Sequence, residues 1–141
     1  MAKPTLDHIG IAVESLAEGV KFYEALGLEL EGVEEVSKQG VKVGFLPVGD
    51  PRIELLEPTG PSSPIAKHLE NRGPGLHHIC VRVADIRASM ASLIDQGYRL
   101  LSNEPQEGAH GCLVCFVHPK STGGVLLELS QSPEASHADS R

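Results

Sequence analysis

Apolar residues alternate with other residues at two places in the chain, about seventy residues apart. The alternating positions are Ile9, Ile11 and Val13 in the first segment and Ile79, Val81 and Val83 in the second. An alternation of period two is typical of a strand that buries one of its faces. The pattern therefore predicts that each segment begins with a strand.

Each of these strands is followed by an apolar stripe with helical spacing. The stripe consists of Leu16, Val20 and Tyr23 in the first segment and of Ile86, Met90 and Leu93 in the second. Ser15 and Glu18 have the spacing of a capping box, and Asp85 is the expected N-cap of the second helix. Gly27 and Gly97 are the expected ends. We therefore assign Tyr23 and Met90 to core packing.

Three more apolar runs follow each helix, and we expect them to be strands. They read LEL, KVGFLPV and RIELLE in the first segment and RLL, LVCFVH and GVLLELS in the second. Turn-forming residues, VGDPR in one segment and HPKSTGG in the other, separate the last two runs. The sequence thus predicts the order βαβββ twice.

The two segments are copies of one repeat, because the second starts 70 residues after the first without a gap, at Leu6 and Leu76. In this register His8 matches His78 and Gly27 matches Gly97. We predict an α+β fold made of two tandem βαβββ modules. The expected parts are a first module at 4–58, a linker with a short helix at 59–73, a second module at 74–131 and a disordered tail at 132–141.

Composition narrows the function. The 141 residues carry a net charge of −7 and have no cluster of Lys and Arg, which argues against nucleic acid as a partner. No apolar stretch approaches the roughly 20 residues of a membrane helix, so no membrane partner is expected. The start MAKPTLDHIG lacks the pattern of a secretory signal, and a cytoplasmic location is the resulting prediction.

The three cysteines are expected to be thiols, since the number is odd and no export signal is visible. Cys112 and Cys115 form a C-x-x-C within an apolar, strand-like run. Buried small hydrophobic residues are the favoured interpretation, ahead of a redox or zinc role.

Two histidines and two carboxylates occupy related positions of the repeat. Neighbouring side chains on a strand face opposite sides, so only His78 of the adjacent His77 and His78 shares the orientation of His8. Glu54 and Glu128 match each other with a four-residue insertion, and both lie among apolar residues. Taken singly, each glutamate could face solvent and each histidine could be a hydrogen-bonded core residue. Together they suit a divalent metal ion of borderline hardness.

The chain resembles the vicinal oxygen chelate superfamily from about Leu6 to Ser130. The resemblance is carried by LDHIGIAV, SPIAKHLENRGPGLHHICVRV and FVHPKSTGGVLLEL, and the spacing of RIELLEP, SPIAKHLENRG and GLHHI is most similar to the methylmalonyl-CoA epimerase family. It implies a cup-shaped, mostly antiparallel sheet and a homodimer. The metal ligands it implies are His8, Glu54, His78 and Glu128. Cobalt is the first expectation, with zinc, manganese, nickel and magnesium left open.

The resemblance implies a metal-dependent epimerase that removes the C2 proton of an acyl-CoA as an enolate forms and returns it to the opposite face. That reaction needs an acid/base group on each side of the substrate. Some members have a glutamate near the position of Val43, so one base is unassigned here, and Glu128 and Glu54 are the candidate catalytic residues. Two alternatives remain open, a glyoxalase I-type lactoylglutathione lyase and a non-catalytic small-molecule-binding protein. His118 and Lys120 are either CoA contacts or parts of a solvated turn.

Overall fold

The computed structural model describes residues 3–133, which divide into two compact units. The first unit is His8–His77, and the second combines residues 1–7 with residues 78–141. The divisions fall inside two strands, β1 (Thr5–Ala12) and β5 (Gly75–Arg82). Most of the tail that is expected to be disordered, residues 134–141, lies outside the described residues.

The first unit contains the strand order β2-β3-β4-β1. β2 (Gly32–Val36) pairs antiparallel with β3 (Val41–Pro47), and β3 pairs antiparallel with β4 (Arg52–Pro58). β4 then runs parallel to β1, with Gly10 opposite Glu54. A short 3-10 helix, Ser37–Gln39, joins β2 to β3, and Gly40 after it adopts a left-handed φ of 63°.

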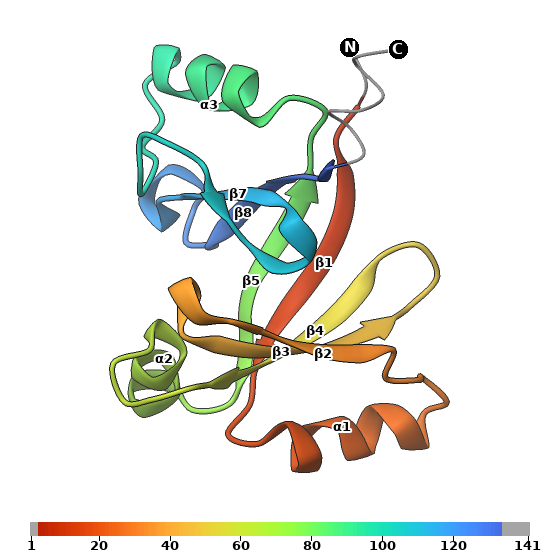
Figure 1. Cartoon of the computed structure of the whole chain (residues 1–141). Coiled ribbons are helices and arrows are strands. Elements are labelled where there is room, and N and C mark those ends of the chain that lie inside the picture. Colours follow the sequence, from red (N-terminus) through yellow and green to blue (C-terminus); the bar gives the residue numbers. More distant parts are fainter. Residues whose placement is uncertain (1–2, 134–141) are drawn as a thin grey trace. The chain divides into compact units, whose positions relative to one another are not determined.

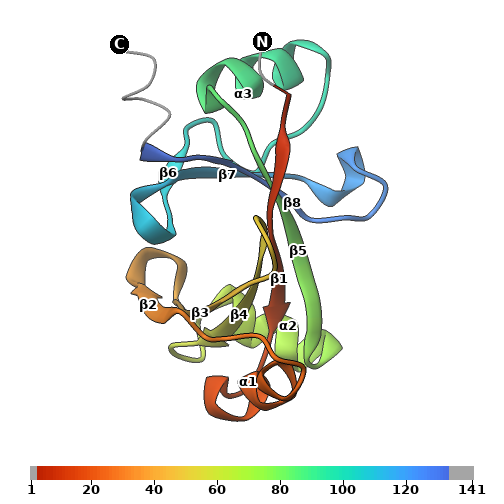
Figure 2. The same cartoon turned by 90° about the vertical axis from the view of Figure 1, so that its right-hand side faces the viewer.

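Helix α1 (Leu16–Ala25) covers one face of this sheet (Figure 1; Figure 2). Ser15 caps it by accepting a hydrogen bond from the amide of Glu18 at 3.3 Å. Its stripe packs with Leu28 and neighbouring strand residues on the buried cluster of Val13, Leu46 and Leu55. Tyr23 belongs to this packing, as the stripe predicts. Helix α2 (Pro64–Arg72), capped by Ser63, confirms the short helix expected in the linker and contacts β4.

The second unit repeats this arrangement with the strand order β5-β8-β7-β6. β8 (Leu127–Gln131) runs parallel to β5 and antiparallel to β7 (Leu113–Val117), and β7 pairs with the short β6 (Gln106–Glu107). Helix α3 (Ile86–Asp95), capped by Asp85, packs Ile86 and Met90 on Cys115 and Leu129. Short 3-10 helices occupy Ala109–Gly111 and Pro119–Ser121.

Both helices α1 and α3 receive a second N-terminal contact from the last strand of their own module. Oε1 of Glu57 accepts a hydrogen bond from the amide of Leu16 at 2.8 Å, and Oε1 of Gln131 accepts one from Ile86 at 2.8 Å. A helix begins with amides that have no partner inside the helix, so each contact satisfies a group that would otherwise need water. Both modules therefore have the same contact between helix and strand, made by a glutamate in one and by a glutamine in the other.

The second strand of each module lies elsewhere than predicted. The run LEL, residues 28–30, is not a strand, and the pairing strand is β2 at Gly32–Val36. Leu28 instead donates its amide to Tyr23 at the end of α1 and packs under that helix. In the second module RLL contributes only an isolated bridge from Leu100 to Val117, and β6 follows later. The two predicted strands are wrong because their apolar residues pack in the core or contact the end of a helix and do not pair in the sheet.

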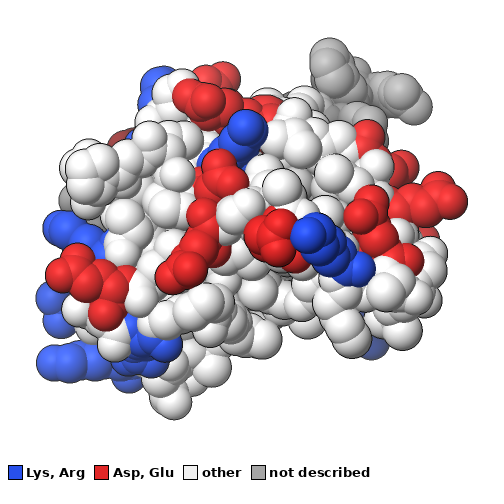
Figure 3. All heavy atoms as spheres, turned by 90° about the horizontal axis from the view of Figure 1, so that it is seen from below, with Lys and Arg blue, Asp and Glu red and all other residues white. Residues whose placement is uncertain are grey.

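The α+β class, the twofold βαβββ order and the mostly antiparallel pairing are confirmed. Among the described residues, no helix has both the length and the apolar character needed to cross a membrane. Acidic and basic side chains are interspersed over the face drawn in Figure 3.

Candidate metal centre

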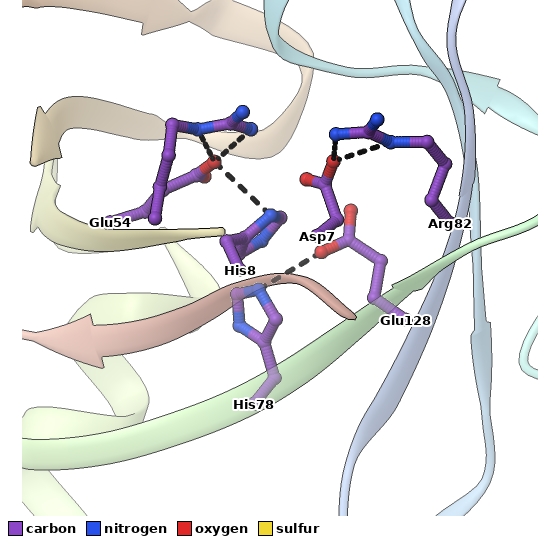
Figure 4. Close-up of polar contacts among 7 residues, drawn as sticks. Asp7, His8, Glu54, His78, Arg82 and Glu128 are labelled. Atoms are coloured by element: carbon purple, nitrogen blue, oxygen red, sulfur yellow. Dashed lines mark hydrogen bonds and ion pairs between the residues drawn. The ribbon is translucent and has the colours of Figure 1, made fainter. Parts of the chain in front are cut away.

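His8 and Glu54 form a buried pair in the first unit. β1 and β4 are neighbours in the sheet, with Gly10 opposite Glu54 and His8 opposite Arg52. Nδ1 of His8 lies 3.1 Å from Oε2 of Glu54, and their side chains are only 7% and 6% exposed (Figure 4). A carboxylate this deeply buried needs strong partners, because desolvation disfavours its charged form.

Arg52 supplies two further contacts to the same carboxylate oxygen. Its Nε and Nη2 donate to Oε2 of Glu54 at 3.2 and 2.8 Å. The guanidinium also lies 5.7 Å from the ring centre of Phe45, the residue opposite Glu54 on β3. Arg52 and Glu54 are two positions apart on β4, which places them on one face of the strand.

His78 and Glu128 form the corresponding pair in the second unit. Nε2 of His78 lies 2.9 Å from Oε1 of Glu128, with both side chains less than a tenth exposed. Cys80 lies opposite Glu128 in the parallel pairing of β5 and β8, just as Gly10 lies opposite Glu54 in the first unit. The ring of Phe116 meets the His78 ring edge-on at 5.8 Å. Each module thus has one imidazole and one carboxylate at corresponding positions of its sheet.

The donor types fit a divalent transition-metal ion. Two imidazoles and two carboxylates are a mixed set that suits zinc, cobalt, nickel or manganese better than a hard cation such as calcium. Each His–Glu pair is buried within its own unit, and buried carboxylates in proteins are paired, neutralised or bound to metal. The side-chain chemistry is therefore compatible with the predicted ligand set.

The two adjacent histidines have different surroundings. His77 meets His68 of α2 edge-on at 4.9 Å in the first unit, whereas His78 contacts Glu128 and Phe116 in the second. Burial and the neighbouring Arg72 lower the pKa of His68 below its usual value. The neutral ring this favours is suited to packing against His77. The ring of His78 thus meets a carboxylate of its own unit.

An ion pair with Arg82 holds Asp7, the residue immediately before His8 in the sequence. Nε and Nη2 of Arg82 donate to Oδ1 of Asp7 at 3.0 and 2.6 Å, and Asp7 is 6% exposed. The ion pair fixes the residue that precedes His8 to the strand that carries His78.

Cys115 and Cys112 do not form a reactive pair. All three cysteines are thiols, and Cys115 is buried in the core under α3. Burial, and secondarily the charge of Glu128, raises the pKa of Cys115 to about 11. A thiol with so high a pKa is a poor nucleophile and metal ligand at neutral pH. The interpretation as a small buried hydrophobic residue is confirmed for Cys115, whereas Cys112, just before β7, is only half-buried.

The sequence does not indicate a role for Arg52, and it leaves two interpretations for His118. Arg52 was overlooked, although its position two residues before Glu54 places both on one face of β4. For His118, the contact and turn interpretations were both open. Its Nδ1 accepts a hydrogen bond from the amide of Lys120 at 3.0 Å, which gives the ring a structural role at the start of the Pro119–Ser121 turn.

The chain belongs to the glyoxalase/bleomycin resistance protein/dioxygenase superfamily, whose family model matches residues 7–116. This match confirms the superfamily indicated by the sequence motifs. The paired βαβββ modules described above are the fold that the resemblance implies.

Within this superfamily the chain is similar to named epimerases. It is 43% identical over 129 residues to the human mitochondrial methylmalonyl-CoA epimerase, covering 90% of this chain and 73% of the relative. It is 44% identical to the ethylmalonyl-CoA/methylmalonyl-CoA epimerase of Cereibacter sphaeroides, covering 89% and 96%. A solved methylmalonyl-CoA epimerase in complex with methylmalonyl-CoA and NH4+ matches with a TM-score of 0.90 and 38% identity, over 95% of this chain and 98% of that one. The predicted likeness to this family is confirmed.

Proposed function

We propose that this protein is a methylmalonyl-CoA epimerase, an isomerase that interconverts the two configurations at C2 of its acyl-CoA substrate. The observation that carries the proposal is the repeated, buried His–Glu pair within a chain about 40% identical to named epimerases over nine-tenths of its length. Small acyl-CoA molecules are the corresponding partner class. Ethylmalonyl-CoA is a second candidate substrate, since one relative carries both acyl groups in its name.

The ligands that we propose for the metal are His8, Glu54, His78 and Glu128. They combine the imidazole and carboxylate donors that a divalent ion of borderline hardness prefers. When bound, such an ion acts as a Lewis acid that stabilises the negative charge developing on the thioester oxygen. Cobalt is the first choice, and zinc, manganese, nickel and magnesium are the others to test.

Glu128 and Glu54 are the candidate groups that hold or accept the substrate proton. Glu128 contacts His78 at 2.9 Å, so its carboxylate is held beside an imidazole in a site that is mostly closed to water. Glu54 is more constrained, because its Oε2 is contacted by His8 and by both donors of Arg52. A carboxylate that must accept and return a proton needs an accessible oxygen. The three nitrogen contacts on its Oε2 therefore argue against Glu54 as the mobile base and leave Glu128 as the first candidate.

Arg52 has a charge-balancing role in this proposal. Two ligand carboxylates alone would cancel the charge of a divalent ion, and the guanidinium beside Glu54 adds one positive charge to the set. The substrate carries a carboxylate, and negative charge grows on its thioester oxygen during proton removal. A site with residual positive charge attracts both.

Glutamine variants test the base assignment. We expect Glu128→Gln to lower turnover by about a hundredfold or more, the effect typical of general acid–base groups. Metal content, measured by elemental analysis after dialysis, should fall much less than turnover. Glu54→Gln is the matched variant in the other module and should lose metal in proportion to activity. Normal turnover in both variants would place the base elsewhere.

The two alternative functions make different predictions. A glyoxalase I-type lyase would use the same four donors but act on a glutathione thiohemiacetal, which this protein should leave unchanged. A non-catalytic binding protein would bind acyl-CoA without exchanging its C2 proton.

We also propose that the protein acts in the cytoplasm and as a homodimer. Size-exclusion chromatography with light scattering tests whether it is a homodimer.

A further inference from the structure

The sheet of the first unit has two distinct faces. One face carries Leu46 and Leu55 and lies under α1. A side chain added at Gly44 would meet Leu16 and Leu30 on that same side. The other face carries Glu54 with Phe45, its partner on β3, and the Arg52 side chain that lies over the Phe45 ring. We call this second side the site face, because it presents the His8–Glu54 pair.

Glu34 on β2 belongs to the site face. The antiparallel register places Glu34 directly opposite Val43, and Val43 directly opposite Leu56. Residues directly opposite each other in a sheet point to the same side, and residues two positions apart on one strand do so too. Val43 is two positions from Phe45, and Leu56 is two positions from Glu54. Glu34, Val43 and Glu54 therefore share one face.

The spacing brings Glu34 to the border of the candidate centre. Val43 is a diagonal neighbour of Glu54, at about 7–8 Å between their Cα atoms, and Glu34 adds one step of about 5 Å across the sheet. Glu34 is half-buried, whereas its neighbour Glu35 is exposed. Along β2, β3 and β4, in the part of the chain that the structure describes, Glu34 and Glu54 are the carboxylates on this face.

Epimerisation at C2 needs two proton-transfer groups, one on each side of the substrate plane. One carboxylate takes the proton from C2 and becomes a carboxylic acid, while the electron pair of the C–H bond moves into the thioester carbonyl to give a planar enolate. A second group, protonated beforehand, then gives its proton to the opposite side of C2. Glu54 is poorly suited to that second role, since three nitrogen contacts converge on its Oε2.

We propose that Glu34 is the second catalytic acid/base, and that it acts from the site face of the first unit. The proposal rests on the epimerase function proposed above. The second base would then come from β2, because Val43 on β3 has no side-chain group that can transfer a proton. Glu34 lies on the same face of the sheet as Glu54, and Val43 lies between them.

The test is proton exchange in Glu34→Gln with each epimer of methylmalonyl-CoA supplied separately in deuterated water. Glu35→Gln is the matched control, because Glu35 is the next residue on β2, points to the opposite face opposite Lys42 and is exposed. Wild-type protein should exchange the C2 proton of both epimers with inversion. Glu34→Gln should lose inversion by about a hundredfold or more. It should still exchange the C2 proton of one epimer, with retention of configuration, through the remaining base.

Other outcomes overturn the proposal. Wild-type inversion rates in Glu34→Gln would show that Glu34 transfers no proton. Equal loss of exchange with both epimers, with melting temperature and metal content unchanged, would show that it does not act on one face. A second variant, Glu34→Gln combined with Val43→Glu, moves the carboxylate one strand closer and should recover inversion at least tenfold. No recovery in a folded, metal-loaded protein would also count against the proposal. A wild-type protein that exchanges neither epimer would instead refute the epimerase function itself.

Discussion

Arg52 makes the two His–Glu pairs unequal at the scale of single residues. The carboxylate of Glu54 accepts two bonds from a guanidinium, whereas the residue two positions before Glu128 is Leu126. Two related positions of the repeat thus differ in local charge. The difference is consistent with separate roles, Glu54 as a fixed ligand and Glu128 as a mobile base.

Replacing Arg52 with methionine tests its charge-balancing role. Even in a medium as polar as water, removing a positive charge a few ångströms from a divalent ion changes its affinity by about a factor of ten. We expect Arg52→Met to bind cobalt about tenfold more tightly and acyl-CoA about tenfold more weakly, as measured by titration calorimetry. Lys21→Met, which removes a charge from an exposed pair with Glu18, is the control. Weaker binding of both ligands would indicate a structural role for Arg52 instead.

Cys115 gives a pH-dependent prediction at the same scale. Burial raises the pKa of its thiol from 9.0 to about 11, so the folded protein holds the proton at pH values where the unfolded chain loses it. The contribution to the free energy of unfolding is complete below about pH 9 and is lost as the pH rises to about 11. The advantage of wild type over Cys115→Ala in urea unfolding should therefore shrink between pH 8 and pH 11, by on the order of 2 kcal/mol. A constant difference would contradict the assignment.

At the scale of elements, the contact between Glu57 of β4 and the start of α1 stabilises the helix. None of the residues of α1 is fully buried, so the helix depends on its caps and its half-buried stripe. We expect Glu57→Ala to lower the free energy of unfolding by about 1–2 kcal/mol, the usual cost of a lost cap. Glu57→Gln should cost much less, because Gln131 makes the same contact in the other module. Thermal unfolding measures both, and equal losses would mean that the charge of Glu57 matters more than its hydrogen bond.

The elements differ in how far sequence predicts them. Helices α1 and α3 are predicted well, since their capping side chains at Ser15 and Asp85 act through local hydrogen bonds. The strands after the helices are misplaced, because Leu28 and Leu100 are apolar for reasons that only the tertiary structure shows. Leu28 packs under α1, and Leu100 packs in the core below α3. Burial alone does not distinguish a strand from a packed loop.

At the scale of the whole molecule, the internal repeat is what makes the candidate site predictable. His8 and His78 are related by the repeat, and so are Glu54 and Glu128; each histidine contacts the carboxylate of its own module in the structure. Glu34 and Arg52 were not found in this way. Arg52 has no counterpart in the second copy, and the face of Glu34 depends on the register of a strand that was misplaced in the sequence.

Metal removal tests the proposed cofactor for the protein as a whole. We expect dialysis against a chelator to abolish isomerisation of methylmalonyl-CoA, and stoichiometric cobalt to restore it. The melting temperature should also rise on adding the ion, because a ligand that binds only the folded state stabilises it. Full activity in protein shown by elemental analysis to lack metal would contradict the proposed ligand set.

The most direct test of the central claim follows a single epimer of methylmalonyl-CoA with cobalt-loaded protein in deuterated water by NMR. We expect deuterium to enter at C2 as the opposite epimer forms, and chelator to stop both processes. A protein that holds one metal ion per chain and leaves the C2 proton in place would contradict the epimerase function. Glutathione thiohemiacetals would then be the substrates to examine.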